Sequence, residues 1–153
     1  MKNKNFLKSF MCASEGFINA LKNEYNLRLD LLLMLSVVYF ALFYGVSRTE
    51  WAVLVVVFSM VIGAELFNTA IENAVDTATE EFNRFAKAAK DTAAAAVFVC
   101  AWGAVACAAL IFCDIQKWGD TLKVIFSRPA TGAVFCILAL LDIICLFYRR
   151  KGK

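Results

Sequence analysis

The sequence predicts an all-α integral membrane protein with an N-terminal interfacial amphipathic helix, three core transmembrane helices and a fourth, C-terminal transmembrane helix. The composition is the first reason, because 61% of the 153 residues are hydrophobic and only 19% are charged. An average soluble domain is about 45–50% apolar and about 25% charged, so a soluble domain could not bury this much apolar surface. The second reason is that the apolar residues form continuous runs, which favours helices over the alternating strands of a membrane barrel.

Residues 1–29 are predicted to form the interfacial helix. Phe6, Phe10, Phe17 and Leu21 recur at helical spacing, and polar residues occupy much of the opposite face. The segment is too polar to cross a bilayer, and a helix with one apolar face lies in the membrane interface. A helix packed on a soluble partner is the alternative interpretation.

Four apolar segments follow, at about residues 31–47, 51–75, 92–113 and 129–148. A hydrocarbon core about 30 Å thick needs about 20 helical residues, within a range of about 17–25, so all four qualify, the first of them marginally. Most of the 16 Lys and Arg residues lie before the first segment, between the second and third, or after the fourth. The positive-inside rule therefore predicts that both termini are cytoplasmic.

The second apolar segment carries four polar side chains on one face of its predicted helix. Glu65, Asn68, Glu72 and Asp76 follow one another at steps of three or four residues, which at about 100° per residue confines them to a stripe about 80° wide. An acidic group inside a membrane is costly and is by default a functional feature. Three carboxylates on one stripe need a cation or protons to neutralise them, and in a chain without histidine Mg²⁺ is the natural cation.

More polar residues are expected at the same cytoplasmic level. Glu24, Arg28 and Asp30 lie where the interfacial helix meets the first span, and Lys90 and Asp91 open the third span. Carboxylates for a metal, a lysine for phosphate and an apolar wall for lipid are the parts that phosphoryl transfer to a lipid needs. The sequence contains neither a Walker A loop nor a kinase glycine loop, which excludes a soluble-type nucleotide fold.

Several of these residues form one extended pattern. It consists of Glu65-x-x-Asn68-x-x-x-Glu72-x-x-x-Asp76, Lys90-Asp91-x-x-Ala94-Ala95-Ala96-Val97 and the pair Glu24-x-x-x-Arg28. The pattern resembles the signature of the bacterial diacylglycerol kinase family, whose Gram-positive members act as undecaprenol kinases. The resemblance extends over residues 6–113. It implies a kinase-like membrane domain at residues 1–113, and leaves residues 114–153 as an extra outer loop, a fourth span and a basic cytoplasmic tail.

The resemblance implies transfer of the γ-phosphoryl of MgATP to a lipid hydroxyl, by a homotrimer in the bacterial cell membrane. It assigns Glu65 as the catalytic base that meets the lipid hydroxyl, and Glu24 and Glu72 as Mg²⁺ ligands that also contact the nucleotide. The other implied nucleotide contacts are Glu81, Phe82, Asn83, Lys90 and Asp91. The residues implied to bind substrate or support the site are Arg28, Asn68, Asp76 and, with its role open, Asp30.

Two departures and several alternatives remain at the level of sequence. Asp30 stands where Gram-positive members often carry histidine, and the fourth span lies beyond the usual three-span core. Asp91 could instead be the N-cap of the third helix, Lys90 could be a positive-inside anchor, and the intramembrane Asp142 could bond to another helix or face a subunit contact. A small cation or proton transporter and a structural membrane subunit are the alternative functions. The small net charge of +3 gives no support for a nucleic-acid partner. The acceptor is undecaprenol or diacylglycerol, and the second-span motif favours undecaprenol.

Overall fold

The computed structural model describes residues 2–79 and 83–148. These ranges contain helices only, which are α1 (Lys2–Asn23), α2 (Tyr25–Tyr44), α3 (Arg48–Ala78), α4 (Arg84–Ile111), α5 (Ile115–Phe126) and α6 (Pro129–Tyr148). Four of them, α2, α3, α4 and α6, are long and apolar enough to cross a membrane. The predicted all-α class with four spans is confirmed.

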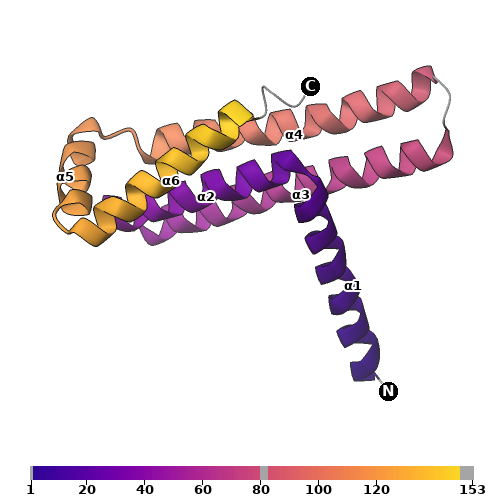
Figure 1. The fold of residues 1–153 in the computed structure, drawn as a ribbon, viewed down its shortest axis with the longest axis horizontal. Helices are drawn as coiled ribbons and strands as arrows, with labels where there is room; N and C mark the ends of the chain where they lie inside the picture. The colour runs from indigo at the N-terminus through magenta and orange to yellow at the C-terminus, as the bar shows by residue number, and fades with distance from the viewer. Residues whose placement is uncertain (1, 80–82, 149–153) are drawn as a thin grey trace.

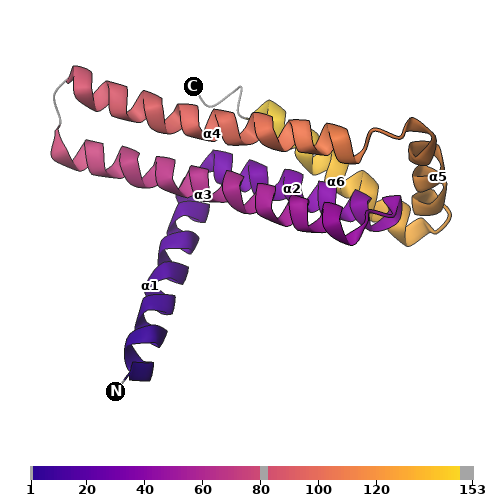
Figure 2. The same ribbon diagram turned by 180° about the vertical axis from the view of Figure 1, so that it is seen from behind.

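The four long helices lie side by side in an elongated bundle (Figures 1 and 2). The antiparallel pair α3–α4 extends beyond the end of α2 at which the chain enters the bundle. Helix α1 leaves the bundle at that entry point and points steeply away from it, while α5 closes the opposite end. If the bundle axis follows the membrane normal, α1 lies along the surface, and its exposed apolar residues Phe6 and Phe10 face the interface.

The turn between α2 and α3 is short, and two local signals explain it. Helix α2 ends at Gly45, whose φ of 78° is in the left-handed region that favours glycine. Helix α3 begins with a capping box, in which the Ser47 side chain accepts from the Glu50 N–H and the Glu50 carboxylate accepts from the Ser47 N–H. This tight turn makes α2 and α3 antiparallel neighbours.

The interfacial helix predicted over residues 1–29 ends at Asn23, and two of the predicted spans start later than the helices that contain them. Helix α2 begins at Tyr25 rather than at residue 31, and α4 begins at Arg84 rather than at residue 92. Hydropathy detects the apolar part of a helix, whereas the helix itself continues through the flanking polar residues. The Asn83 side chain caps α4 by accepting from the Phe85 and Ala86 N–H groups, so the alternative that Asp91 is the N-cap is wrong.

The connection between the third and fourth spans, predicted as a loop, contains helix α5. The Asp114 side chain caps it by accepting from the N–H groups of Gln116 and Lys117, at 3.1 and 3.4 Å. Ile125 of α5 is fully buried and belongs to an apolar core with Phe40 and Tyr44 of α2. The extension is therefore packed on the bundle through α2.

Helix α6 is tied to α2 by polar bonds as well as by apolar packing. The Ser36 hydroxyl donates to Asp142 Oδ2 at 2.7 Å, and the Tyr39 hydroxyl donates to the Thr131 carbonyl at 2.8 Å. The expectation that Asp142 bonds to another helix is confirmed. Such bonds between helices stabilise packing inside a membrane, where apolar surfaces gain little from contact with one another.

Candidate active site

The stripe begins at Glu65, which is buried on the inward face of α3. Only 4% of Glu65 is exposed, and the residue lies on the same face as Leu54 and Val61, which are also buried. One turn further on, the Thr69 hydroxyl donates to the Glu65 carbonyl at 3.1 Å. A carboxylic side chain is thus placed where bulk water is largely excluded, which is the environment that a reaction with a lipid hydroxyl requires.

The next two members of the stripe are joined to each other. Asn68 Nδ2 donates to Glu72 Oε1 at 2.8 Å along one turn of α3. The Asn68 Oδ1 atom is buried and has no hydrogen-bond partner within the described parts of the chain. The amide therefore orients the Glu72 carboxylate, and its buried carbonyl oxygen is open to a donor from a ligand or a second subunit.

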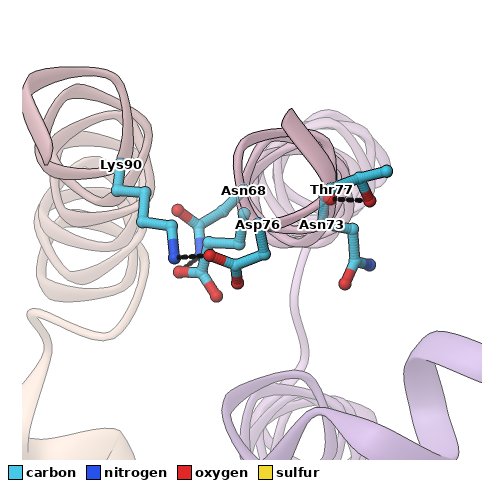
Figure 3. A network of polar contacts seen from close by, with 6 residues as sticks. Asn68, Asn73, Asp76, Thr77 and Lys90 are labelled. Carbon is cyan, nitrogen blue, oxygen red and sulfur yellow. Dashed lines mark hydrogen bonds and ion pairs between the residues drawn. The ribbon is translucent and has the colours of Figure 1, made fainter. Parts of the chain in front are cut away.

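The last member of the stripe connects α3 to α4. Lys90 Nζ forms an ion pair with Asp76 Oδ1, and both side chains point into the space between the two helices (Figure 3). Asn73 and Thr77 project from the other side of α3. The Lys90 and Asp76 side chains are 35% and 66% exposed, so water screens the pair and it adds at most about 1 kcal/mol to stability. Its main consequence is positional, because it holds a lysine ammonium beside the carboxylates.

The residues predicted near the first span lie at the corner between α1 and α2. Glu24 is the N-cap residue of α2, but its side chain makes no capping bond. Arg28 Nη1 donates to the Lys22 carbonyl at 2.7 Å and so satisfies the C-terminal end of α1. Asp30 is half-buried on α2. Of these three residues, Arg28 has a clear structural task, which is to fix the corner.

The predicted nucleotide contacts are only partly described. Lys90 lies in the stripe, and Asp91 is the exposed next residue of α4, turned about 100° away from it. The Asn83 side chain is used as the cap of α4. Glu81 and Phe82 lie outside the described residues. The ion pair between Lys90 and Asp76 was not foreseen, although both residues were singled out, because each was considered on its own helix.

Helix α1 meets α3 partway along the stripe. A hollow of about 390 Å³ between α1 and α3 is lined by Phe17 and Ala20 of α1 and by Leu66, Thr69 and Asn73 of α3, among others. Glu65 precedes the α3 residues that line this hollow, whereas Asp76 follows them toward the end of α3. The stripe thus passes from a buried carboxylic group to exposed charges.

The described residues contain no group of three or more Asp, Glu, Cys or His side chains that could hold a metal ion by itself. The oxygen donors still suit Mg²⁺, which commonly takes one or two carboxylates and completes its shell with water and phosphate oxygens. The bond from Asn68 uses one oxygen of the Glu72 carboxylate, and Glu24 is not engaged in capping. Each carboxylate therefore keeps at least one oxygen that could bind a metal ion.

Known proteins are similar to the part of the chain that contains these residues. The family model described as prokaryotic diacylglycerol kinase matches residues 11–112. Over 102 residues the chain is 33% identical to the undecaprenol kinase of Bacillus subtilis, a match that covers 67% of this chain and 81% of that protein. It is 34% identical over 96 residues to the diacylglycerol kinase of Pseudomonas aeruginosa, with 63% and 78% covered.

A further relative, the diacylglycerol kinase of Synechocystis sp., is 35% identical over 102 residues, which are 66% of this chain and 58% of that protein. No solved structure matches the chain at a significant level. The region matched by the family model contains the whole stripe and ends just after α4, so α5 and α6 lie outside it.

Proposed function

Since this chain belongs to the prokaryotic diacylglycerol kinase family and is an ATP-dependent membrane lipid kinase, we propose that the stripe of α3 is where the γ-phosphoryl of ATP passes to a lipid hydroxyl. The observation that carries the proposal is the buried Glu65 on the same helix face as Glu72 and the Asp76–Lys90 pair. Membership of a kinase family also argues against the two alternative functions that the sequence left open, a cation or proton transporter and a structural membrane subunit.

Glu65 is the proposed catalytic base. A lipid alcohol holds its proton too tightly at neutral pH to attack phosphorus unaided, so a positioned base is needed. As the hydroxyl oxygen bonds to the γ-phosphorus, Glu65 takes the hydroxyl proton, the bond from the γ-phosphorus to the bridging oxygen breaks, and ADP leaves with the electron pair. The burial of Glu65 favours a lipid hydroxyl over water as the acceptor.

The charges beyond Glu65 are proposed to hold the nucleotide. Glu24 and Glu72 would bind Mg²⁺, with Asn68 fixing the orientation of Glu72. When bound, the ion neutralises charge that develops on the phosphate oxygens. Lys90 would exchange Asp76 for a phosphate oxygen as ATP enters, and Asp76 keeps the ammonium in position until then.

The remaining assignments surround this centre. Asp91, Asn83 and the pair Glu81 and Phe82 are proposed to border the nucleotide. Arg28 is proposed to act through the α1–α2 corner that it fixes, beside the point where a lipid would approach. Asp30 is half-buried on the first span and is proposed to stabilise the structure at the point where the lipid approaches.

Undecaprenol is the proposed acceptor, with diacylglycerol as the alternative. The support is the Asn68–Glu72 motif together with the similarity to a protein named undecaprenol kinase, of which the match covers 81%. The apolar surroundings of the stripe suit either lipid. A side-by-side assay with both acceptors decides between them.

A homotrimer with both termini in the cytoplasm is proposed for the assembly, with residues 1–113 as its catalytic core. The buried Asn68 Oδ1 atom, which has no partner within the described parts of the chain, offers an acceptor for a donor from a neighbouring subunit. The mass of the complex in lipid nanodiscs tests the trimer. A monomer that retains full turnover would contradict it.

The catalytic proposal is tested with purified protein in lipid vesicles, radiolabelled ATP and each lipid alcohol. Wild-type protein is expected to form lipid phosphate, and Glu65→Gln is expected to lower kcat by about 100- to 10,000-fold, the usual contribution of a positioned base. Glu15→Gln, at an exposed acid of α1, is the matched control and is expected to retain activity. Transfer to neither alcohol would overturn the proposed reaction, and full turnover by Glu65→Gln would remove the base.

A further inference from the structure

The extension borders an open apolar cavity that belongs to none of the groups discussed above. It measures about 530 Å³ and lies between α2, α4, α5 and α6, with Phe40, Phe112, Trp118 and Phe135 among its lining residues. This volume falls within the range of about 300–1,000 Å³ that is typical of small-molecule sites. Two of its lining residues, Trp118 and Leu122, belong to α5, which lies at the opposite end of the bundle from the C-terminal end of α3 and the N-terminal end of α4 (Figures 1 and 2).

One corner of this cavity is polar. Ser36 of α2 and Asp142 of α6 both line it, and the Ser36 hydroxyl donates to Asp142 Oδ2 at 2.7 Å. The second carboxyl oxygen, Oδ1, is buried and finds no partner among residues 2–79 and 83–148. A buried acceptor without a donor costs free energy, so a ligand that supplies one donor would stabilise this corner.

The size of the cavity decides what kind of molecule fits. An α-helix with its side chains is about 10 Å wide and rises about 1.5 Å per residue, so this volume would hold little more than one turn. A helix could therefore cover the open side of the cavity but not enter it, whereas a hydrocarbon chain is narrow enough to lie inside it. The donor is expected to be uncharged, because a buried ammonium group would lose far more hydration than a hydroxyl.

We propose that the α5–α6 extension forms a second, non-catalytic binding site for a lipid alcohol. The hydrocarbon chain occupies the aromatic end beside Trp118, and the hydroxyl donates to the Asp142 carboxyl group. Polyprenols and diacylglycerols both combine these features. Because the lining of the cavity includes neither Glu65 nor Lys90, the site binds its ligand without ATP and independently of phosphoryl transfer.

The test uses Trp118 as a reporter in full-length protein in nanodiscs of saturated phosphatidylcholine. Trp51→Phe and Trp102→Phe leave Trp118 as the single tryptophan of the three. Dibrominated octadecanol is the quenching probe, and dibrominated octadecane is the matched probe without a hydroxyl. We expect saturable quenching by the alcohol at concentrations up to about tenfold lower than by the alkane, the upper end of the ratio that one hydrogen bond provides.

Three substitutions in this background locate the site. Asp142→Leu is expected to remove the preference for the alcohol while quenching by the alkane persists. Ala139→Phe, at a residue that lines the cavity, is expected to abolish saturable quenching by both probes. Ala133→Phe, at an exposed position of the same helix, is the matched control and is expected to bind like the parent protein.

Unlabelled undecaprenol and diacylglycerol are then added as competitors. Displacement of the alcohol probe by either supports the site and identifies the source of its ligand. Equal, unsaturable quenching by both probes that Ala139→Phe leaves unchanged would mean ordinary contact with bilayer lipid and would overturn the proposal. A change of oligomeric mass in Ala139→Phe with unchanged quenching would assign the cavity to a subunit interface and would also overturn it. None of these measurements depends on kinase activity.

Discussion

Replacing Lys90 with methionine is expected to weaken the use of ATP far more than it weakens the fold. Methionine keeps an unbranched apolar chain and removes the three donors and the charge. The Asp76 partner is 66% exposed and the Lys90 side chain 35% exposed, so the loss of their ion pair is expected to lower the free energy of unfolding by at most about 1 kcal/mol.

The expected effect on catalysis is larger because the triphosphate of ATP carries several negative charges, whereas the Asp76 carboxylate carries one. Hydrogen bonds to charged groups contribute about 1.5–3 kcal/mol, which corresponds to an increase of about 10- to 150-fold in the KM for ATP. The assay measures lipid phosphate at saturating lipid alcohol while the MgATP concentration is varied. Thermal unfolding in the same detergent gives the cost to stability.

Two further variants distinguish a direct contact between Lys90 and the phosphates from a general effect of positive charge on ATP binding. Lys87→Met removes an equal charge from an exposed position on the same helix and is expected to leave the KM for ATP unchanged. Asp76→Asn keeps the Lys90 ammonium but removes the carboxylate that pairs with it. Its effect on the KM for ATP is therefore expected to be smaller than that of Lys90→Met. If Lys90→Met changes the KM for ATP no more than Lys87→Met does, Lys90 does not touch the phosphates and its proposed role is refuted.

Three further outcomes are expected. Asn68→Ala removes the bond that orients Glu72, so the Mg²⁺ concentration for half-maximal rate is expected to rise about 10- to 100-fold; an unchanged requirement would contradict the assignment of Glu72. Asp114→Ala removes the cap of α5 and is expected to cost about 1 kcal/mol of stability, seen as a lower unfolding temperature with kinase activity retained. In single-cysteine variants, an impermeant maleimide applied to intact cells is expected to label Cys113 and to spare Cys12, both exposed residues; the opposite pattern would invert the proposed topology.

The helices and the stripe could be predicted because both depend on spacing within one segment. A run of apolar residues gives a span whatever its neighbours are, and Glu65 and Glu72 share a face of any α-helix. Asn83 shows the limit of this reasoning. The family pattern places it near the nucleotide, whereas its local position places its side chain on the first N–H groups of α4.

What sequence reasoning missed depends on short helices and on contacts between distant segments. Helix α5 has only 12 residues, too few to form a span, and Asp114 was not recognised as the cap that starts it. The bond between Ser36 and Asp142 joins residues 106 positions apart. No sequence pattern in α2 or α6 indicates that the two helices are partners, so the bond becomes apparent only once α6 is packed on α2.

The depth of the site follows from the different lengths of the helices. Helix α3 has 31 residues and α4 has 28, whereas α2 has 20, so the α3–α4 pair must project past the level at which α1 turns away (Figure 1). Glu65 and Asp76 are 11 positions apart on α3, which is about 16 Å along its axis. One helix thereby carries both the buried Glu65, the proposed base, and the exposed Asp76, which holds the proposed phosphate-binding Lys90. An enzyme that joins a lipid alcohol to a water-soluble nucleotide needs this separation, and a loop of the same length could not keep it fixed.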